Sequence, residues 1–304
     1  MTAAQGGRAR SRGGGPLGGE GRWALLFLAP TLIGLAILSA GPILATVAIS
    51  LTEWDLLRAP QFIGLDNFVE LVSDDRFHKA LRNTAFYTIV SVPLGMTISL
   101  FLALALNQAF RGIAWIRTAY FLPVVTSTIA IALVWQWIYS PDSGLLNQVL
   151  GLVGVPPQRW LADPTLVMPS IVAMSVWQGL GVSTIIFLAG LQAIPTELLD
   201  AASVDGAGRW ARFRSIVLPL LTPSIFFTGI LSLIAAFQVF DQVFVLSRPR
   251  PTDATITVVY FIYENGFKFF RMGYATAASW ILFLIVAVLT AIYFRSQDRW
   301  VHYQ

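Results

Sequence analysis

One segment whose residue types could do chemistry is residues 192–218, which lies between two long apolar runs and holds six charged side chains. This segment, called the polar loop below, holds carboxylates, arginines and aromatic rings, and it has no histidine or cysteine. Catalysis needs a positioned nucleophile, base or metal ligand set, and the polar loop offers no recognisable cluster of that kind. On residue types alone, it predicts a solvated amphipathic connector.

Two short helices are expected in the polar loop. Thr196 is a candidate N-cap for the first helix, because its hydroxyl can accept a hydrogen bond from a free N–H group of the first turn. Glu197 and Asp200 would then lie near the positive end of the helix dipole. Gly206 stands where a helix C-terminus favours a left-handed residue, so the first helix should end there.

The second helix of the polar loop is expected at about Arg209–Val217. It places Arg209 and Arg212 on one side with two aromatic rings between them, a pattern typical of a helix at the membrane interface. Pro219 is expected to end this helix before the next apolar run begins.

No catalytic residue, metal or cofactor is expected on this chain. It has no cysteine, which excludes thiol catalysis, iron–sulfur clusters and cysteine zinc sites. Its two histidines, His78 and His302, lie outside the apolar runs. It has neither an H-E-x-x-H zinc motif nor a G-x-x-x-x-G-K-[ST] phosphate loop. If the chain takes part in active transport, the energy source must therefore sit on another chain.

The composition places the chain in a membrane. Apolar residues make up 56% of it and charged residues only 12%, whereas soluble domains are about a quarter charged. Six stretches lack Asp, Glu, Lys and Arg, and each exceeds the ~20 residues that a helix needs to cross the hydrocarbon layer. They are Trp23–Thr52, Asn83–Phe110, Thr118–Pro141, Pro164–Thr196, Ser215–Phe240 and Met272–Phe294. The sequence thus predicts an all-α, polytopic membrane protein with six transmembrane helices.

Other segments have their own predictions. Residues 1–22, rich in glycine and arginine, are expected to form a disordered cytosolic tail, and residues 23–304 the transmembrane domain. Ala254–Phe270 is expected to form an interfacial or re-entrant helix on the outer face. Ser143–Gln158 is interrupted by glycines and prolines, so it is expected to be a loop with one short helix at the surface.

The orientation follows from arginines around the first apolar run. Arg8, Arg10, Arg12 and Arg22 precede it, and Arg58 follows it. Basic residues favour the cytosolic side, so the amino terminus, the polar loop and the carboxy terminus are all expected in the cytosol. The first run is much longer than the 7–15 residues of a signal-peptide core, which favours an uncleaved first helix.

The fixed positions of the polar loop match a known pattern. Asp200-Ala-Ala, three residues, Gly206, nine residues and then Ile216-x-Leu218-Pro219 resembles the E-A-A-x3-G-x9-I-x-L-P signature of permease subunits of binding-protein-dependent ABC importers. The spacing agrees throughout. Asp200 stands where the family usually has Glu, which keeps the charge and shortens the side chain by one methylene group.

The resemblance extends from about Leu25 to the end of the chain. Further segments look like the sugar and glycerol-phosphate permeases of that family, the maltose-type six-helix group: Phe62–Phe68, Asn83-Thr84, Phe121–Val124, Val134–Trp137, Gly144–Asn147 and Met272–Ala275. One departure follows Phe240-Asp241, where the family often continues into Gly-Gly-Pro and this chain reads Arg248-Pro-Arg-Pro251. That outer loop would face the binding protein, so its docking chemistry is expected to differ.

This resemblance implies a type I importer fold in a bacterial or archaeal cytoplasmic membrane. It implies a second permease subunit, two ATPase subunits that carry ATP and Mg, and an extracytoplasmic solute-binding protein, with no nucleic acid. In such proteins the loop helix inserts into a groove on the ATPase. The residues expected to couple to it are Glu197, Asp200, Ala201, Ala202, Asp205, Gly206, Arg209 and Pro219. The implied solute is a sugar or a related polyhydroxylated compound.

The solute path should run between the two permeases, along spans three to six. Its candidate residues on this chain are Trp135, Gln178, Gln238 and Asp241. An aromatic face and amide groups suit a polyhydroxylated solute, although each of these residues could equally serve helix packing or anchoring at the interface.

The alternative function is that of an ion-coupled secondary carrier. Such a carrier needs buried coupling charges and usually shows inverted repeats. The predicted spans are free of charge, and the nearest candidate is Asp241 at the outer end of span five. A membrane enzyme is a weaker alternative, because no catalytic cluster is recognisable.

Overall fold

The computed structural model describes residues 19–108, 112–247 and 253–301, and most of these residues are helical. The helices are α1 Gly19–Leu35, α2 Gly41–Ser50, α3 Asp66–Ser73, α4 Asp75–Leu106, α5 Ile113–Val125, α6 Thr128–Ile138, α7 Leu145–Gly151, α8 Val167–Gln192, α9 Thr196–Val204, α10 Arg209–Arg212, α11 Leu218–Leu220, α12 Thr222–Phe237, α13 Asp241–Leu246, α14 Val258–Tyr263 and α15 Met272–Ser296. The π-helical or 3₁₀ turns are η1 Ala36–Ala40, η2 Phe213–Val217, η3 Glu264–Lys268 and η4 Gln297–Arg299. Two short strands, β1 Thr52–Glu53 and β2 Gln61–Phe62, pair antiparallel, with Thr52 opposite Phe62.

The six apolar runs correspond to four long helices and two bent helix pairs. Within the described residues, the stretches long and apolar enough to cross a membrane are Trp23–Ser50, Asp75–Leu106, Val167–Gln192 and Met272–Arg299. The third and fifth runs are each broken into a pair of helices that passes the same test together. The prediction of six spans therefore holds if each bent pair counts as one span.

The break in the third run was not predicted, whereas a helix end close to the second break was expected at Pro219. The helix pair of the third run turns by 112° between Val125 and Thr128, where the backbone of Thr126 is extended. The pair of the fifth run turns by 62° at Leu221. Non-helical backbone inside a membrane is tolerated where it is enclosed by protein or faces a water-filled cavity, so the break in the third run points to the interior of an assembly.

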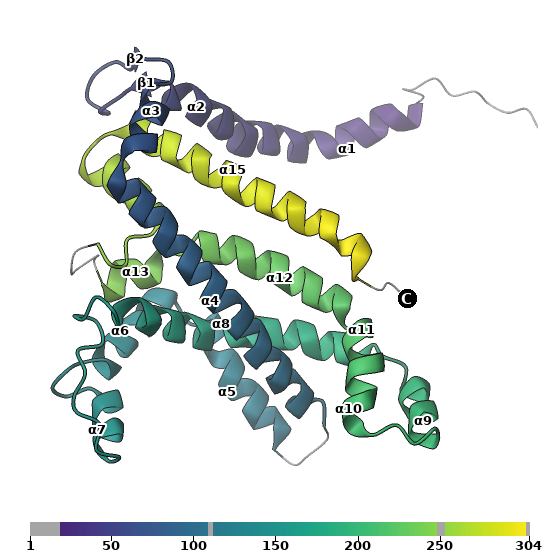
Figure 1. The fold of residues 1–304 in the computed structure, drawn as a ribbon. Coiled ribbons are helices and arrows are strands. Elements are labelled where there is room, and N and C mark those ends of the chain that lie inside the picture. Colours follow the sequence, from purple (N-terminus) through teal and green to yellow (C-terminus); the bar gives the residue numbers. More distant parts are fainter. Residues whose placement is uncertain (1–18, 109–111, 248–252, 302–304) are drawn as a thin grey trace, which may run out of the picture.

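Helices α4 and α8 form the centre of the molecule. They pack most extensively against each other, α12 lies against both, and α5 packs along α8 (Figure 1). A large buried cluster of apolar side chains joins α4, α6, α8, α12, α13, α14 and α15. This cluster fixes the broken segments against the long helices.

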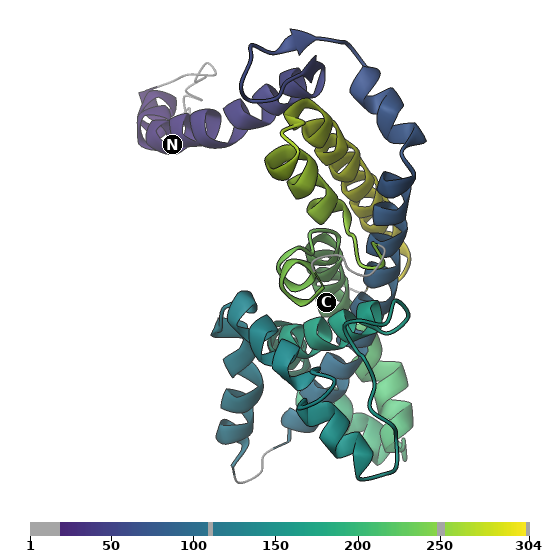
Figure 2. The same cartoon turned by 90° about the vertical axis from the view of Figure 1, so that its left-hand side faces the viewer.

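The first span stands apart from this centre. In both views α1 extends away from the other helices, and only its continuation α2 packs along α15 (Figures 1 and 2). Apolar side chains such as Phe27 and Leu38 are more than 75% exposed. An apolar helix of this kind needs lipid or a partner subunit around it. Residues 1–18 of the predicted tail lie outside the described residues, and α1 begins at Gly19, before the predicted start at Trp23.

Within Ala254–Phe270 the helix begins at Val258, and α14 with η3 packs against α4 and α15. Its position relative to the membrane stays a prediction. Side-chain hydrogen bonds hold it there: the amide of Asn83 donates to the carbonyl of Ile256 at 2.9 Å, and the hydroxyl of Thr84 accepts from the N–H of Val258 at 3.0 Å. The Asn83-Thr84 pair thus serves as a joint between α4 and this segment. The short helix predicted within Ser143–Gln158 is confirmed as α7.

A network of charges strengthens the same joint. The guanidinium of Arg76 pairs with Asp253 at 2.9 Å and with the nearly buried Glu264, which also pairs with Lys268 at 3.1 Å. Lys268 donates to the hydroxyl of Tyr260, and this hydrogen bond raises the pKa of Lys268 above its ordinary value. Arg76 therefore links the start of α4 to both ends of the segment 253–268.

Replacing this arginine should loosen the joint. We expect Arg76→Ala to lower the free energy of unfolding by about 2 kcal/mol, because it leaves the Glu264 carboxylate with one of its two cationic partners while Arg76 itself is partly solvated. Thermal unfolding of the detergent-solubilised chain measures the effect. The control is Glu70→Gln, which removes a half-exposed pair with Arg271 and should cost less than ~1 kcal/mol. Equal effects of the two variants would contradict the role given to Arg76.

Candidate functional site

The polar loop folds as two helices, as predicted, with a different start. The backbone enters α9 after Pro195, so Thr196 is already helical and no side chain caps the first turn. The prediction of Thr196 as N-cap is therefore wrong. The hydrogen bond from the N–H of Leu198 to the carbonyl of Pro195 closes the first turn instead.

Gly206 ends α9 as predicted. Its φ is +80°, in the left-handed region that glycine adopts without strain. The N–H of Ala207 bonds to the carbonyl of Ala202 at 2.9 Å, and the N–H of Gly206 bonds to the carbonyl of Ser203 at 3.1 Å. These two bonds form a Schellman motif, which satisfies carbonyl groups at the end of the helix and turns the chain back toward α10.

The second helix of the polar loop is longer than predicted. Helix α10, η2 and α11 follow one another without a break from Arg209 to Leu220. Pro219 lies inside this run and does not end it, and the chain bends at Leu221 instead. A proline is tolerated inside a helix where the preceding turn is irregular, and here the π-helical turn η2 precedes it.

One contact ties the two helices of the polar loop together. The guanidinium of Arg212 donates to the hydroxyl of Ser203. On the other side the rings of Trp210 and Phe213 stack with their centroids 5.4 Å apart. Arg212 and the Schellman turn together set the angle between α9 and α10.

The residues expected to couple the polar loop to a partner are mostly exposed. Glu197, Asp200, Ala201, Asp205, Gly206 and Arg209 are exposed, whereas Ala202 and Pro219 are half-buried. Apolar side chains accompany them, with Leu198 45% and Val204 88% exposed. Apolar groups exposed beside carboxylates are typical of a surface that meets another protein.

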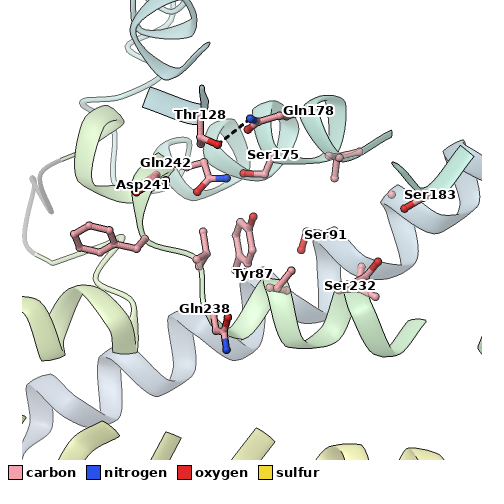
Figure 3. A pocket seen from close by; sticks show the side chains of 18 of the residues that line it. Tyr87, Ser91, Thr128, Ser175, Gln178, Ser183, Ser232, Gln238, Asp241 and Gln242 are labelled. Atoms are coloured by element: carbon pink, nitrogen blue, oxygen red, sulfur yellow. Dashed lines mark hydrogen bonds between the residues drawn. The ribbon is translucent and has the colours of Figure 1, made fainter. Parts of the chain in front are cut away.

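A cavity of about 490 Å³ lies between α4, α6, α8, α12 and α13, next to the break before Thr128 (Figure 3). Gln178, Gln238 and Asp241 from the predicted path all line it. Asp241 is the first residue of α13, and Gln238 caps the end of α12, so the break between these helices carries both side chains. Trp135 does not line this cavity and packs against Trp177, with the ring centroids 5.6 Å apart.

Two of the buried polar atoms in the cavity, on Ser175 and Gln178, have no hydrogen-bond partner among the described residues. The amide nitrogen of Gln178 donates to the hydroxyl of Thr128 at 3.0 Å, drawn as the dashed line in Figure 3. The amide oxygen of Gln178 is buried and has no partner among the described residues. A solute that donates a hydrogen bond would satisfy this oxygen.

Several lining residues were missed by the sequence reasoning. They are Tyr87, Ser91, Thr128, Ser175, Ser183, Ser232 and Gln242. Their hydroxyl groups, and the amide of Gln242, are compatible with a lipid-facing or packed helix, so residue type alone does not distinguish them. The signal was their spacing: Tyr87 and Ser91 are four residues apart on α4, which places them on one face of the helix.

These features define a class of protein: a membrane transport subunit with a polar cavity between its spans and an exposed loop at one end. Residues 95–302 match the family described as binding-protein-dependent transport system inner membrane component. The chain belongs to this family.

Relatives support the family along nearly the whole chain. It is 39% identical over 283 residues to the probable ABC transporter permease protein YesP of Bacillus subtilis (91% of each chain). It is 34% identical to the lactose transport system permease protein LacF of Rhizobium radiobacter (88% and 92%) and 35% identical to the sn-glycerol-3-phosphate permease protein UgpA of Agrobacterium fabrum (80% and 83%).

Solved structures agree with this placement. A chain of a bacterial ABC transporter that imports the acidic polysaccharide alginate matches with a TM-score of 0.81 at 26% identity, covering 92% of this chain and 96% of the other. The same transporter in complex with its alginate-loaded periplasmic protein matches with a TM-score of 0.82. The chain is thus a multi-pass, non-enzymatic permease component of an ABC importer with the type I fold, and the ion-coupled carrier is not supported.

Proposed function

We propose that this chain forms half of the path by which an ATP-driven importer carries a sugar or related polyhydroxylated solute. The observation that carries the proposal is the polar cavity between spans that are otherwise apolar. Hydroxyl and amide groups from separate helices converge there, as in sites for small polar ligands. We infer that a second, similar permease completes the path and covers part of the apolar surface that α1 and α2 leave exposed.

We propose that the polar loop couples this path to ATPase subunits, which supply ATP and Mg. Ile194 and Leu221, at the two ends of the loop, belong to one buried cluster with Phe187 of α8 and Ala103 of α4. A force applied to α9 is therefore transmitted to the long helices as a rigid-body movement. Such a two-state lever is what alternating access requires.

We propose that both termini and the polar loop face the cytosol. The described start of α1, the end of α15 and helices α9 and α10 lie toward the same side of the molecule in Figure 1, which supports this orientation. The arginine-rich start points the same way.

A cysteine at Ser203 tests the orientation, because the native chain has no cysteine. We expect Ser203→Cys to react with a membrane-impermeant maleimide only after the cells are opened. Ser143→Cys, at the exposed turn before α7, should react in intact cells. Labelling of Ser203→Cys from outside would show that the orientation is reversed.

Dependence on the ATPase subunits tests the function itself. Reconstituted alone, the chain should give no sugar uptake above empty liposomes, because it has no phosphate-binding loop. Reconstituted with its second permease, ATPases and binding protein, it should give uptake that requires ATP. Saturable uptake by the chain alone under an ion gradient would contradict the proposal.

A further inference from the structure

The lining of the cavity is unbalanced in charge. Among the described residues that line it, Asp241 is charged, and none is Lys, Arg or His. Asp241 is half-buried, and no ion pair or hydrogen bond engages its side chain in the described part of the chain. The described salt bridges of Arg76, Lys268 and Arg271 are all made with other carboxylates.

The negative charge of Asp241 affects the electrostatic potential throughout the cavity. The walls of the cavity are helices, which have a lower dielectric constant than water and screen the charge less. The field of a fixed charge is focused into a cleft of this kind, so that solutes of opposite charge are concentrated there and solutes of like charge are depleted. Rings of acidic side chains act in this way in cation-selective pores.

The hydrogen-bonding groups of the cavity also favour solutes that are not anions. Among the cavity groups without a partner in the described residues, the buried amide oxygen of Gln178 and the carboxylate of Asp241 only accept hydrogen bonds, while the hydroxyl of Ser175 can do either. Both acceptors can bind hydroxyl or ammonium groups, which donate hydrogen bonds. The charged group of a phosphate ester or a uronate only accepts hydrogen bonds, so that group cannot satisfy these two oxygens.

We propose that Asp241 makes this cavity select against anions, so that the cargo is a neutral or amine-bearing polyhydroxylated solute and not a phosphate ester or a uronic acid. The inference rests on the proposed function, in which this cavity is the solute path. The family alone does not decide the matter, because its relatives are named for neutral and for anionic compounds alike.

Charged thiol reagents measure the potential in the cavity directly. A single cysteine is placed at Ser91 on α4, or at Ser232 on α12, in the assembled transporter. Its reaction rates with cationic 2-trimethylammonioethyl and anionic 2-sulfonatoethyl methanethiosulfonate are each divided by the rate of the same reagent with 2-mercaptoethanol. We expect a cation-to-anion ratio on the order of ten in the cavity, which corresponds to one weakly screened unit charge nearby.

Variants at Asp241 assign the potential to one residue. Asp241→Asn should bring the ratio down to about one, and Asp241→Glu should keep it. The control Asp142→Asn, at an exposed turn outside the cavity, should leave it unchanged. If Asp241→Asn does not assemble, the cation-to-anion ratio measured with Asp241 present still tests the proposal. A ratio at or below one overturns it, and so does a cysteine that neither reagent reaches.

The outcome is separable from that of the proposed function, because the labelling rates do not require transport. A transporter that fails to accumulate any sugar but shows the expected ratio would refute the proposed function and leave the charge assignment intact. ATP-driven uptake of sn-glycerol 3-phosphate equal to that of trehalose, through the cavity with Asp241 present, would refute the selectivity and leave the proposed function intact.

Discussion

Gly206→Leu is expected to leave the transporter assembled with its second permease and to reduce binding-protein-stimulated ATP hydrolysis at least about five-fold. The φ of Gly206 is +80°, and a side chain in this region costs about 1–2 kcal/mol. That amount alone changes an equilibrium roughly 5- to 30-fold. A Cβ at this position would meet no atom of the chain itself within 4 Å, so the leucine would project into the space where we place the ATPase.

Two further variants make this prediction specific. Asp200→Lys should act in the same direction, because it reverses the charge of an exposed carboxylate on α9. Ser215→Ala, at an exposed position of the same loop outside the fixed pattern, should be close to silent. Hydrolysis by the reconstituted complex and a pull-down of its subunits are the two measurements. If Gly206→Leu assembles, hydrolyses ATP with normal stimulation and transports normally, the polar loop is only a connector.

The sequence was informative wherever one residue type has one physical use. Runs without charge locate the spans because a charged group in hydrocarbon is costly. Gly206 locates the end of α9 because left-handed backbone favours glycine. The family signature adds no structural information to this, because the same rules already explain why Gly206 stands at its position.

The break between α5 and α6 and the lining of the cavity could not be predicted from residue type in this way. The residues between α5 and α6, Thr126 and Ser127, lie in a run without charge that is long enough for one span, and both residue types also occur inside membrane helices. The lining of the cavity depends on which faces of α4, α8 and α12 meet, and this is a property of the tertiary structure. Trp135 is the opposite case. Its residue type was compatible with the solute path, but in the structure it packs against Trp177.

The first and last spans meet at Gly273, and an added methyl group at this contact should lower the stability of the chain strongly. The carbonyl of Thr52 accepts from the amide of Asn67 at 2.9 Å, and the N–H of Met272 bonds to the carbonyl of Trp54 at 2.9 Å. Gly273 sits between these bonds, and a Cβ there would overlap the Thr52 carbonyl oxygen. Glycine is needed at this position because two backbones meet.

Gly273→Ala is therefore expected to destabilise the chain by roughly 3 kcal/mol, because the overlapping atoms belong to the backbone of another element and neither can rotate away. In a chain of this size, that loss lowers the apparent unfolding temperature by roughly 6–12 °C, which scanning fluorimetry of the detergent-solubilised chain can measure. Gly151→Ala at the end of α7 is the matched control, since a Cβ there meets nothing within 4 Å and its change should stay within ~0.5 kcal/mol. An unchanged unfolding temperature for Gly273→Ala would mean that α2 and α15 do not meet at this contact, and the packing of the first span against the rest of the chain would have to be redrawn.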